Sequence, residues 1–185
     1  MPSEEMQKVL DTLFARRAVR AGGPAPASVE EERAGFVPAD VLHPIPADVT
    51  VTDVTVGSAS AHWLIPPGAD PDRVLLFLHG GGFQFGSVRS DGELASRIGR
   101  AAGMTVLFLE YRLAPEHPYQ AAIDDVIAAW RWLRTERGLD PASMAVAGDS
   151  AGGGLARLPV DPPPEAAEAT EHAGAFLRRH ITGGA

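Results

Sequence analysis

Three short apolar runs, separated by two segments with helical periodicity, place the strongest limits on how this chain folds. The runs cover 73–78, 104–109 and 144–147, and continuous apolar character over such a length suits strands inside a sheet. Between them, 91–102 and 121–134 repeat apolar residues at helical spacing. Strands and helices of this size form βαβ units, so the sequence predicts an α/β fold with a mostly parallel sheet flanked by helices.

Further elements are expected nearer the amino terminus. Ser3 is a candidate cap for a first helix with apolar residues at helical spacing between 6 and 14. A capping-box pattern at 28–31 predicts a short second helix. High β-branched content over 49–56 and a second short run at 60–65 predict two strands. Within the later helix at 91–102, the sequence gives one apolar side, formed by Leu94, Ile98 and Ala101.

The charge balance and the residue types limit the partners of the chain. Its 185 residues carry a formal net charge of −8 with Lys8 as the single lysine, so nucleic acid is not expected as a main partner. The chain has no cysteine, which excludes disulfides and thiolate metal sites. The sequence shows no signal-peptide pattern and no apolar run long enough to span a bilayer, so we expect a cytoplasmic protein.

A glycine-flanked serine is the strongest chemical signal, in the segment Gly148-Asp149-Ser150-Ala151-Gly152. This G-x-S-x-G form after an apolar strand is typical of a nucleophile elbow. In a tight strand–turn–helix the two glycines face each other closely, and a side chain at either position would clash. The serine would take a strained conformation at a helix amino terminus, where developing negative charge is stabilised. The alternative is a glycine-rich turn with an incidental serine.

A second motif, His79-Gly80-Gly81-Gly82-Phe83, directly follows the strongest apolar run. The glycines would let main-chain N–H groups approach a substrate carbonyl and stabilise an oxyanion. A phosphate-cradling loop or a plain turn are the alternatives, and the phosphate loop fits poorly because its G-x-x-x-x-G-K-[ST] pattern is missing. Two motifs in this order, each after a predicted strand, favour acyl-transfer chemistry.

A third motif follows the run at 104–109 and reads Tyr111-Arg112-Leu113-Ala114-Pro115-Glu116-His117-Pro118. With it, the chain resembles the hormone-sensitive-lipase-like branch of the α/β hydrolases, the esterases marked by HGGG, YRLAPEHP and GDSAGG. The resemblance covers 28–155 in register. It implies a partial α/β-hydrolase fold with an amino-terminal helical cap, and hydrolysis of small carboxylic esters through an acyl-enzyme without a cofactor or metal.

The resemblance also implies roles for individual residues. Ser150 corresponds to the nucleophile of the family. The oxyanion hole corresponds to the N–H groups of Gly81, Gly82 and Ala151. Support of the site is implied for a further set, namely His79, Asp149, Arg112, Glu116 and His117.

The family's later segments, D-P-L-x-D with the acid and H-x-F with the base, are not found after Ser150. Instead, 158–180 resembles the family's terminal helix, which indicates an internal deletion or a misassembled gene with the later strands missing. The expected organisation is a helical cap segment at 1–45, a truncated core at 46–157, and a proline-rich linker with a terminal helix at 158–185.

This departure predicts weak or absent catalysis, because Ser150 without a base keeps an unactivated hydroxyl. After Ser150, the residues of the types that serve as acid and base are Asp161, His172 and His180. The strand at 144–147 would become a sheet edge without guarding charges, which favours self-association. Two alternatives stay open: a non-catalytic remnant that binds acyl groups or a partner, and an esterase completed by the histidine and aspartate of a partner chain.

Overall fold

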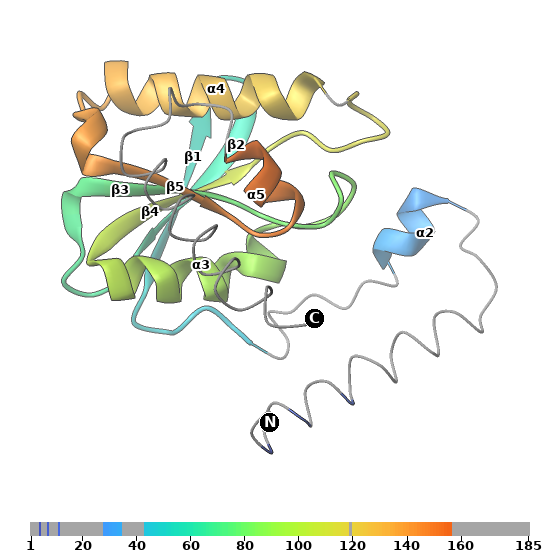
Figure 1. Ribbon diagram of the computed structural model, residues 1–185, viewed down its shortest axis with the longest axis horizontal. Coiled ribbons are helices and arrows are strands. Elements are labelled where there is room, and N and C mark those ends of the chain that lie inside the picture. Colours follow the sequence, from blue (N-terminus) through green and yellow to red (C-terminus); the bar gives the residue numbers. More distant parts are fainter. Residues whose placement is uncertain are drawn as a thin grey trace, which may run out of the picture. The chain divides into compact units, whose positions relative to one another are not determined.

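The computed structural model divides the chain into two compact units, Met1–Val37 and Pro38–Ala185. The residues that it describes are 4, 7, 11, 28–34, 43–118 and 120–156. Figure 1 draws the described helices and strands of both units as ribbons.

The first unit contains the short helix α2, Val29–Ala34. The backbone N–H of Glu31 donates to Ser28 Oγ at 3.1 Å, which confirms the cap expected at this position. Glu4, Gln7 and Asp11 are helical, with Gln7 Nε2 donating to Asp11 Oδ1 at 2.9 Å. Ser3 and the rest of the expected first helix lie outside the described residues.

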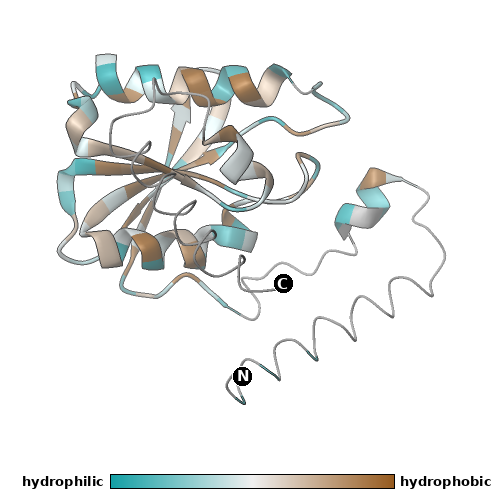
Figure 2. Ribbon diagram, in the orientation of Figure 1, coloured by the Kyte–Doolittle hydropathy of each residue, from teal (hydrophilic) through white to brown (hydrophobic). Residues whose placement is uncertain are grey.

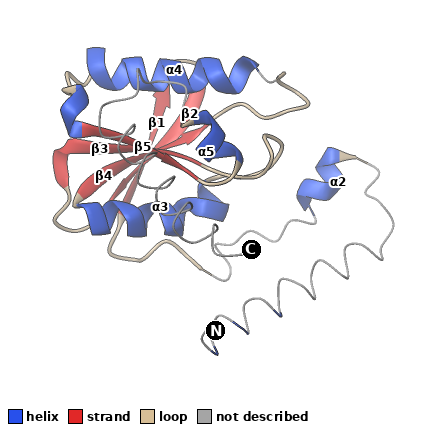
Figure 3. Ribbon diagram, viewed as in Figure 1, coloured by secondary structure: helices blue, strands red, loops and turns tan. Residues whose placement is uncertain are grey.

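The second unit is built on a five-stranded sheet in the order β1-β2-β4-β3-β5 (Figure 3). Its strands are β1 Thr50–Val56, β2 Ala59–Ile65, β3 Asp70–Leu78, β4 Met104–Glu110 and β5 Met144–Gly148. β2 pairs antiparallel with both β1 and β4, whereas β3 pairs parallel with both β4 and β5. The sheet is therefore mixed: the expected parallel arrangement holds for β4, β3 and β5, and the hairpin of β1 and β2 adds two antiparallel strands.

The helices of this unit are α3 Val88–Ala102, α4 Gln120–Thr135 and α5 Ala151–Leu155, with a 3₁₀ turn η2 at Pro141–Ser143. α3 and α4 lie on opposite faces of the sheet (Figure 1). Alternate strand residues pack on the two sides, with Leu76 and Leu78 toward α4 and α5, and Phe77 toward α3. Hydrophobic residues accordingly run along the central strands (Figure 2). This helix–sheet–helix layering confirms the predicted α/β fold.

The helix α3 begins before the expected position because Ser87 caps it. Ser87 Oγ accepts from the N–H of Arg89 at 3.2 Å, and Ser90 Oγ accepts from the N–H of Ser87 at 2.9 Å. These reciprocal bonds satisfy backbone donors that a helix start leaves without an intrahelical partner. The helix therefore includes residues 88–90, which the apolar spacing alone did not reveal.

The packing side of α3 differs from the apolar side that the sequence indicates. Leu94 and Ile98 are 41% and 36% exposed, and Ala101 is exposed as well. The buried residues of this helix are small, namely Gly92, Ala95, Ser96 and Gly99. A Cβ atom on Gly99 would overlap the side chain of Val106, so glycine lets the helix approach β4 closely. The contact between α3 and the sheet is therefore made by small residues, because the helix lies close to β4, and the larger apolar residues Leu94 and Ile98 stay exposed next to this contact.

The strand β5 forms one edge of the sheet among the described residues, with β3 as its partner. All five of its residues are half-buried, and none is charged. An edge of this kind presents unpaired backbone N–H and C=O groups beside apolar side chains. This edge was expected from the sequence, and β5 is itself the strand that leads to Ser150.

Candidate active site

Ser150 lies in a sharp turn between β5, which ends at Gly148, and α5, which begins at Ala151. Its backbone has φ 48° and ψ −113°, in the left-handed half of conformational space that non-glycine residues rarely adopt. A residue held there costs of order 1–3 kcal/mol, and such strain persists only where its surroundings fix it. Ser150 itself is exposed. The turn thus has the backbone form expected of a nucleophile elbow.

The two glycines of the elbow are required by close backbone contacts. A Cβ atom on Gly148 would overlap the carbonyl group of Gly152, so these two residues face each other directly. A Cβ atom on Gly152 would overlap the carbonyl oxygen of Leu78 and stand 2.5 Å from that of His79. The predicted close approach of Gly148 and Gly152 is confirmed, and it extends to the end of β3.

The glycine motif and the serine motif lie side by side at the carboxyl ends of β3 and β5. Leu78 and Gly148 are paired in the parallel register of β3 and β5, so both loops leave from the carboxyl ends of adjacent strands. The N–H of Asp149 donates to the Leu78 carbonyl at 3.1 Å. The carboxylate of Asp149 lies against Gly80, where a Cβ atom would stand 2.5 Å from Oδ2. Asp149 therefore joins the two motifs.

The glycine loop has a tight left-handed course. Gly81, Gly82 and Phe83 have φ values of 111°, 62° and 63°. The N–H groups of Gln84 and Phe85 donate to the Gly81 carbonyl at 3.1 and 3.0 Å and close the turn. Within the described part of the chain, the N–H groups of Gly81, Gly82 and Ala151 donate none of the hydrogen bonds. Among the described residues, these three amides therefore have no acceptor, and the Ala151 amide directly follows Ser150.

His79 is locked in the interior rather than directed at Ser150. It is fully buried, and its Nδ1 bonds the Gly80 carbonyl at 2.8 Å, so Nδ1 carries the proton. The imidazole stacks on the Tyr111 ring at 4.2 Å between centroids, and the Tyr111 hydroxyl donates to the His79 carbonyl at 2.7 Å. Its Nε2 has no hydrogen-bond partner among the residues that the structure describes. Burial raises the pKa of Tyr111, which keeps that hydroxyl protonated.

Arg112 is tied to an acidic residue that the sequence reasoning did not single out. Asp125, on α4, is 2% exposed and accepts from Arg112 Nε at 2.9 Å and Nη2 at 2.8 Å. It also accepts from the backbone N–H of Arg112 at 2.9 Å. The hydrogen bond to Asp125 raises the pKa of Arg112. One signal existed in the sequence: Asp125 lies three residues after Ala122 and four before Ala129, at the spacing of one helix face whose other members are apolar.

The loop after Arg112 contacts the glycine loop. The N–H of Ala114 donates to the Phe83 carbonyl at 2.8 Å, and the N–H of His117 donates to the Leu113 carbonyl at 2.9 Å. Glu116 and His117 are exposed on this loop. The three motifs that were noted in the sequence therefore form one assembly around Ser150.

No histidine bonds to Ser150 in the ranges that the structure describes. His79 bonds the Gly80 carbonyl, and His43 and His117 are exposed. His62 Nδ1 pairs with Asp53 Oδ1 at 2.8 Å, and its Nε2 lies 3.5 Å from Glu110 Oε1. The later candidates, Asp161, His172 and His180, fall outside the described residues.

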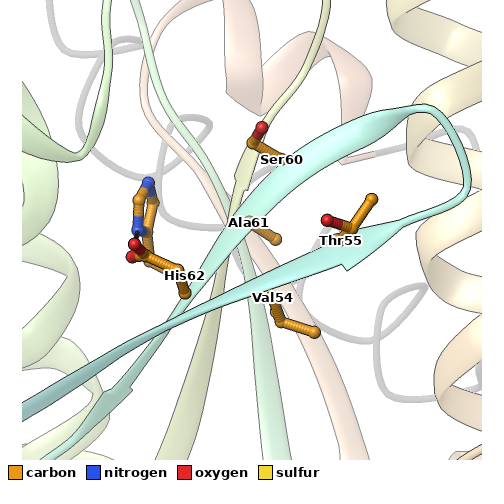
Figure 4. A pocket seen from close by; sticks show the side chains of 6 residues that line it. Val54, Thr55, Ser60, Ala61 and His62 are labelled. Carbon is orange, nitrogen blue, oxygen red and sulfur yellow. Dashed lines mark hydrogen bonds and ion pairs between the residues drawn. The ribbon is translucent and has the colours of Figure 1, made fainter.

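The contacting side chains of His62 and Asp53 help to line a shallow pocket of about 230 Å³ on the hairpin of β1 and β2 (Figure 4). Two strands, β4 and β3, separate this hairpin from β5 in the sheet. The pocket is therefore remote from Ser150 and has no part in the site. Among the described residues, no cluster of three or more His, Asp or Glu residues could hold a metal ion. The same residues contain no helix long and apolar enough to cross a bilayer.

Comparisons with known proteins agree with this geometry. Residues 75–159 match the family model described as the α/β hydrolase fold. The chain is 41% identical over 156 residues to an acetyl-hydrolase of Streptomyces hygroscopicus, a match that covers 84% of this chain and 50% of that protein. An ethyl acetate hydrolase of Pseudomonas putida is 38% identical over 119 residues, which cover 58% of this chain and 37% of that protein.

Solved structures show the same relationship. The crystal structure of an esterase from the bacterial hormone-sensitive lipase family matches with a TM-score of 0.71 at 38% identity, over 84% of this chain and 50% of that one. The fold and the turn at Ser150 thus define an α/β-hydrolase fold. Within that class of fold, the chain is similar to an acetyl-hydrolase and to an esterase of the bacterial hormone-sensitive lipase family. It spans half or less of the length of these relatives.

Proposed function

We propose that this chain carries the nucleophile and the oxyanion hole of a carboxylic ester hydrolase. The observation that carries the proposal is the strained backbone of Ser150, with φ 48°, beside three amides that donate no hydrogen bond within the described residues. The Ser150 hydroxyl would attack the ester carbonyl, and the N–H groups of Gly81, Gly82 and Ala151 would stabilise the oxyanion. Departure of the alcohol would leave an acyl-serine that water hydrolyses, with no cofactor.

Small acetyl esters are the substrates that we propose. The support comes from relatives whose names describe an acetyl-hydrolase and an ethyl acetate hydrolase. We assign supporting roles to the residues that hold the loops, because Asp149 bridges the two motifs and the His79 ring fills the space beneath the glycine loop. Arg112 holds the third motif to α4, and Glu116 lies further along the same loop.

The same geometry argues that catalysis by this chain is weak. A serine hydroxyl needs a base to accept its proton, and none of the described histidines bonds to Ser150. Removal of a triad member leaves about 10³–10⁴-fold acceleration over water, which comes from the oxyanion hole and binding. We therefore expect slow acylation of Ser150 and slower release of the acyl group.

The proposal is tested with p-nitrophenyl acetate, comparing the purified chain with Ser150→Ala. We expect a small excess of nitrophenol release by the unmodified chain and an acetyl group on Ser150 that mass spectrometry detects. A fluorophosphonate probe should modify the same residue. Equal rates for both proteins and an unmodified Ser150 would rule out the nucleophile role.

That negative result would favour a second function, a non-catalytic module that binds acyl groups or a protein partner. The observation in its favour is the absence of a base next to Ser150 in the part of the chain that the structure describes. The edge of β5, which has no strand partner other than β3 among the described residues, adds a further expectation, self-association of the isolated chain. Light scattering over a range of concentrations measures it, and a constant monomer mass would contradict it.

A further inference from the structure

Asp125 is a buried acidic residue that has no part in the reaction proposed for Ser150. It lies on the inner side of α4, where the buried residues around it are Ala122, Val126 and Ala129, and it is 2% exposed. An ionised carboxylate in such surroundings is costly unless it is paired and fully hydrogen-bonded. The hydrogen bonds that Asp125 accepts must therefore offset the free-energy cost of removing its carboxylate from water.

Asp125 holds two segments besides its own helix. Its carboxylate accepts the Nε, Nη2 and backbone N–H groups of Arg112 at distances between 2.8 and 3.1 Å. Ser58 Oγ, in the turn between β1 and β2, donates to Asp125 Oδ1 at 3.3 Å. Since a paired guanidinium and a backbone amide converge on one carboxylate, both the side chain and the main chain of Arg112 are fixed.

The segment fixed at Arg112 continues directly to the oxyanion loop. Ala114, two residues further on, donates its N–H to the Phe83 carbonyl at 2.8 Å. Phe83 has φ 63°, a conformation that a bulky residue does not keep without external contacts. Phe83 is the residue immediately after Gly82, whose N–H is one of the proposed oxyanion donors. The contacts therefore run from Asp125 through Arg112 and Ala114 to the strained end of the glycine loop.

We propose that Asp125 is a positioning residue for the oxyanion hole. It acts through Arg112, which keeps Ala114 in place to hold Phe83, and thereby orients the N–H groups of Gly81 and Gly82. This inference rests on the proposed function for its effect on chemistry. Its structural part, the hold on the loop, is independent of that function.

The test uses Asp125→Asn, which keeps the size of the side chain and removes its charge. Asp124→Asn is the matched control, because Asp124 is exposed on the same helix and, among the described residues, its carboxylate accepts a hydrogen bond from Gln120 Nε2 at 3.2 Å and none from Arg112. Its charge also acts on Arg112, so this control removes a nearby charge without removing the hydrogen bonds to Arg112. Leu133→Ala is the second control, because Leu133 is fully buried further along α4 and its truncation destabilises the fold away from this network.

Two readouts separate the structural and the chemical parts. Amide hydrogen exchange at Gln84, Phe85 and Ala114 reports the bonds of the two loops, and acetylation of Ser150 by p-nitrophenyl acetate reports the chemistry. For Asp125→Asn we expect exchange at these amides to rise about tenfold more than at core amides of β3 and β4. Acetylation should slow by about tenfold to a hundredfold, because small displacements of catalytic groups have effects of this size.

The outcomes distinguish the two proposals. Local exchange that matches the Asp124→Asn control, or an equal local rise in Leu133→Ala, overturns the positioning role. If Asp125→Asn releases the loops while the unmodified chain is never acetylated at Ser150, the positioning role stands and the proposed function fails. If the loops are released and acetylation of Ser150 nevertheless keeps its full rate, Asp125 does not orient the oxyanion donors and the inference is wrong.

Discussion

The close contact between the elbow and β3 leads to a prediction about Gly152. In Gly152→Ala, the new methyl group would overlap the Leu78 carbonyl oxygen and stand 2.5 Å from that of His79, where ordinary contact begins near 3.4 Å. Both neighbours are backbone atoms at the end of a central strand, so no flexible side chain can move aside. Relief requires α5 to retreat by about 1 Å, which lengthens the bond from the Asp149 N–H to Leu78.

The magnitude follows from these two effects. Overpacking of this kind costs about 1–3 kcal/mol, and the weakened buried hydrogen bond adds about 1 kcal/mol. We therefore expect Gly152→Ala to lower the free energy of unfolding by about 3 kcal/mol, a large part of the roughly 5–15 kcal/mol that stabilises an ordinary domain. Urea titration followed by tryptophan fluorescence measures this loss.

The same short helix supplies matched controls. A Cβ atom on Gly154 meets nothing within 4 Å, so Gly154→Ala should raise the free energy of unfolding by about 0.5–1 kcal/mol through helix propensity. A Cβ atom on Gly153 would stand 3.2 Å from the Gly148 carbonyl oxygen, so Gly153→Ala should fall between the other two. The reasoning is refuted if Gly152→Ala unfolds within about 0.5 kcal/mol of the unmodified chain, the range of neutral surface changes.

Two further predictions concern α3 and its surroundings. Leu94→Gln should change the free energy of unfolding by less than about 0.5 kcal/mol, because Leu94 is exposed. Gly99→Ala should lower the free energy of unfolding by about 1–3 kcal/mol, because the new methyl group would overlap Val106. Urea titrations measure both changes, and a larger loss for Leu94→Gln than for Gly99→Ala would contradict the packing side assigned to α3. The Arg100 side chain donates to Asp48 at 2.7 Å and lowers the pKa of that carboxyl. Because the folded-state pKa of Asp48 lies below its unfolded value, the pairing contributes stability that is lost as the pH falls through the folded-state pKa. Arg100→Ala removes the hydrogen bond and should move the Asp48 titration to higher pH in NMR spectra. An unchanged titration would exclude this pairing.

The sequence predicted the parts of the fold in which a local physical constraint allows a single type of residue, such as apolar residues in a buried strand or glycine in a tight turn. The run from Val74 to Leu78 is apolar throughout because both faces of β3 are buried, so the strand is visible without any tertiary information. Gly148 and Gly152 were interpretable for a similar reason, since a tight elbow has no room for a Cβ atom. These local constraints reveal the position of Ser150.

Other features depended on contacts between distant segments. Hydrophobic spacing indicates Leu94 and Ile98 as the apolar side of α3, but close approach to Val106 makes Gly99 the contact residue, and glycine carries no hydrophobic signal. The role of Asp125 on α4 is visible only in the structure, because its partner Arg112 lies thirteen positions earlier in the chain.

The two edges of the sheet are unequal in their capacity to accept another strand. β1 carries a charged residue, Asp53, in its middle, whereas β5 is Met144–Gly148 and carries none. Charged edge residues discourage the addition of a strand, so growth of this sheet is favoured on the β5 side. A strand added there in parallel would end beside Gly148, and the loop after it would emerge next to Ser150. A strand that adds to the favoured edge would therefore bring its following loop to the side of Ser150 where, in the proposed reaction, the hydroxyl needs a proton acceptor.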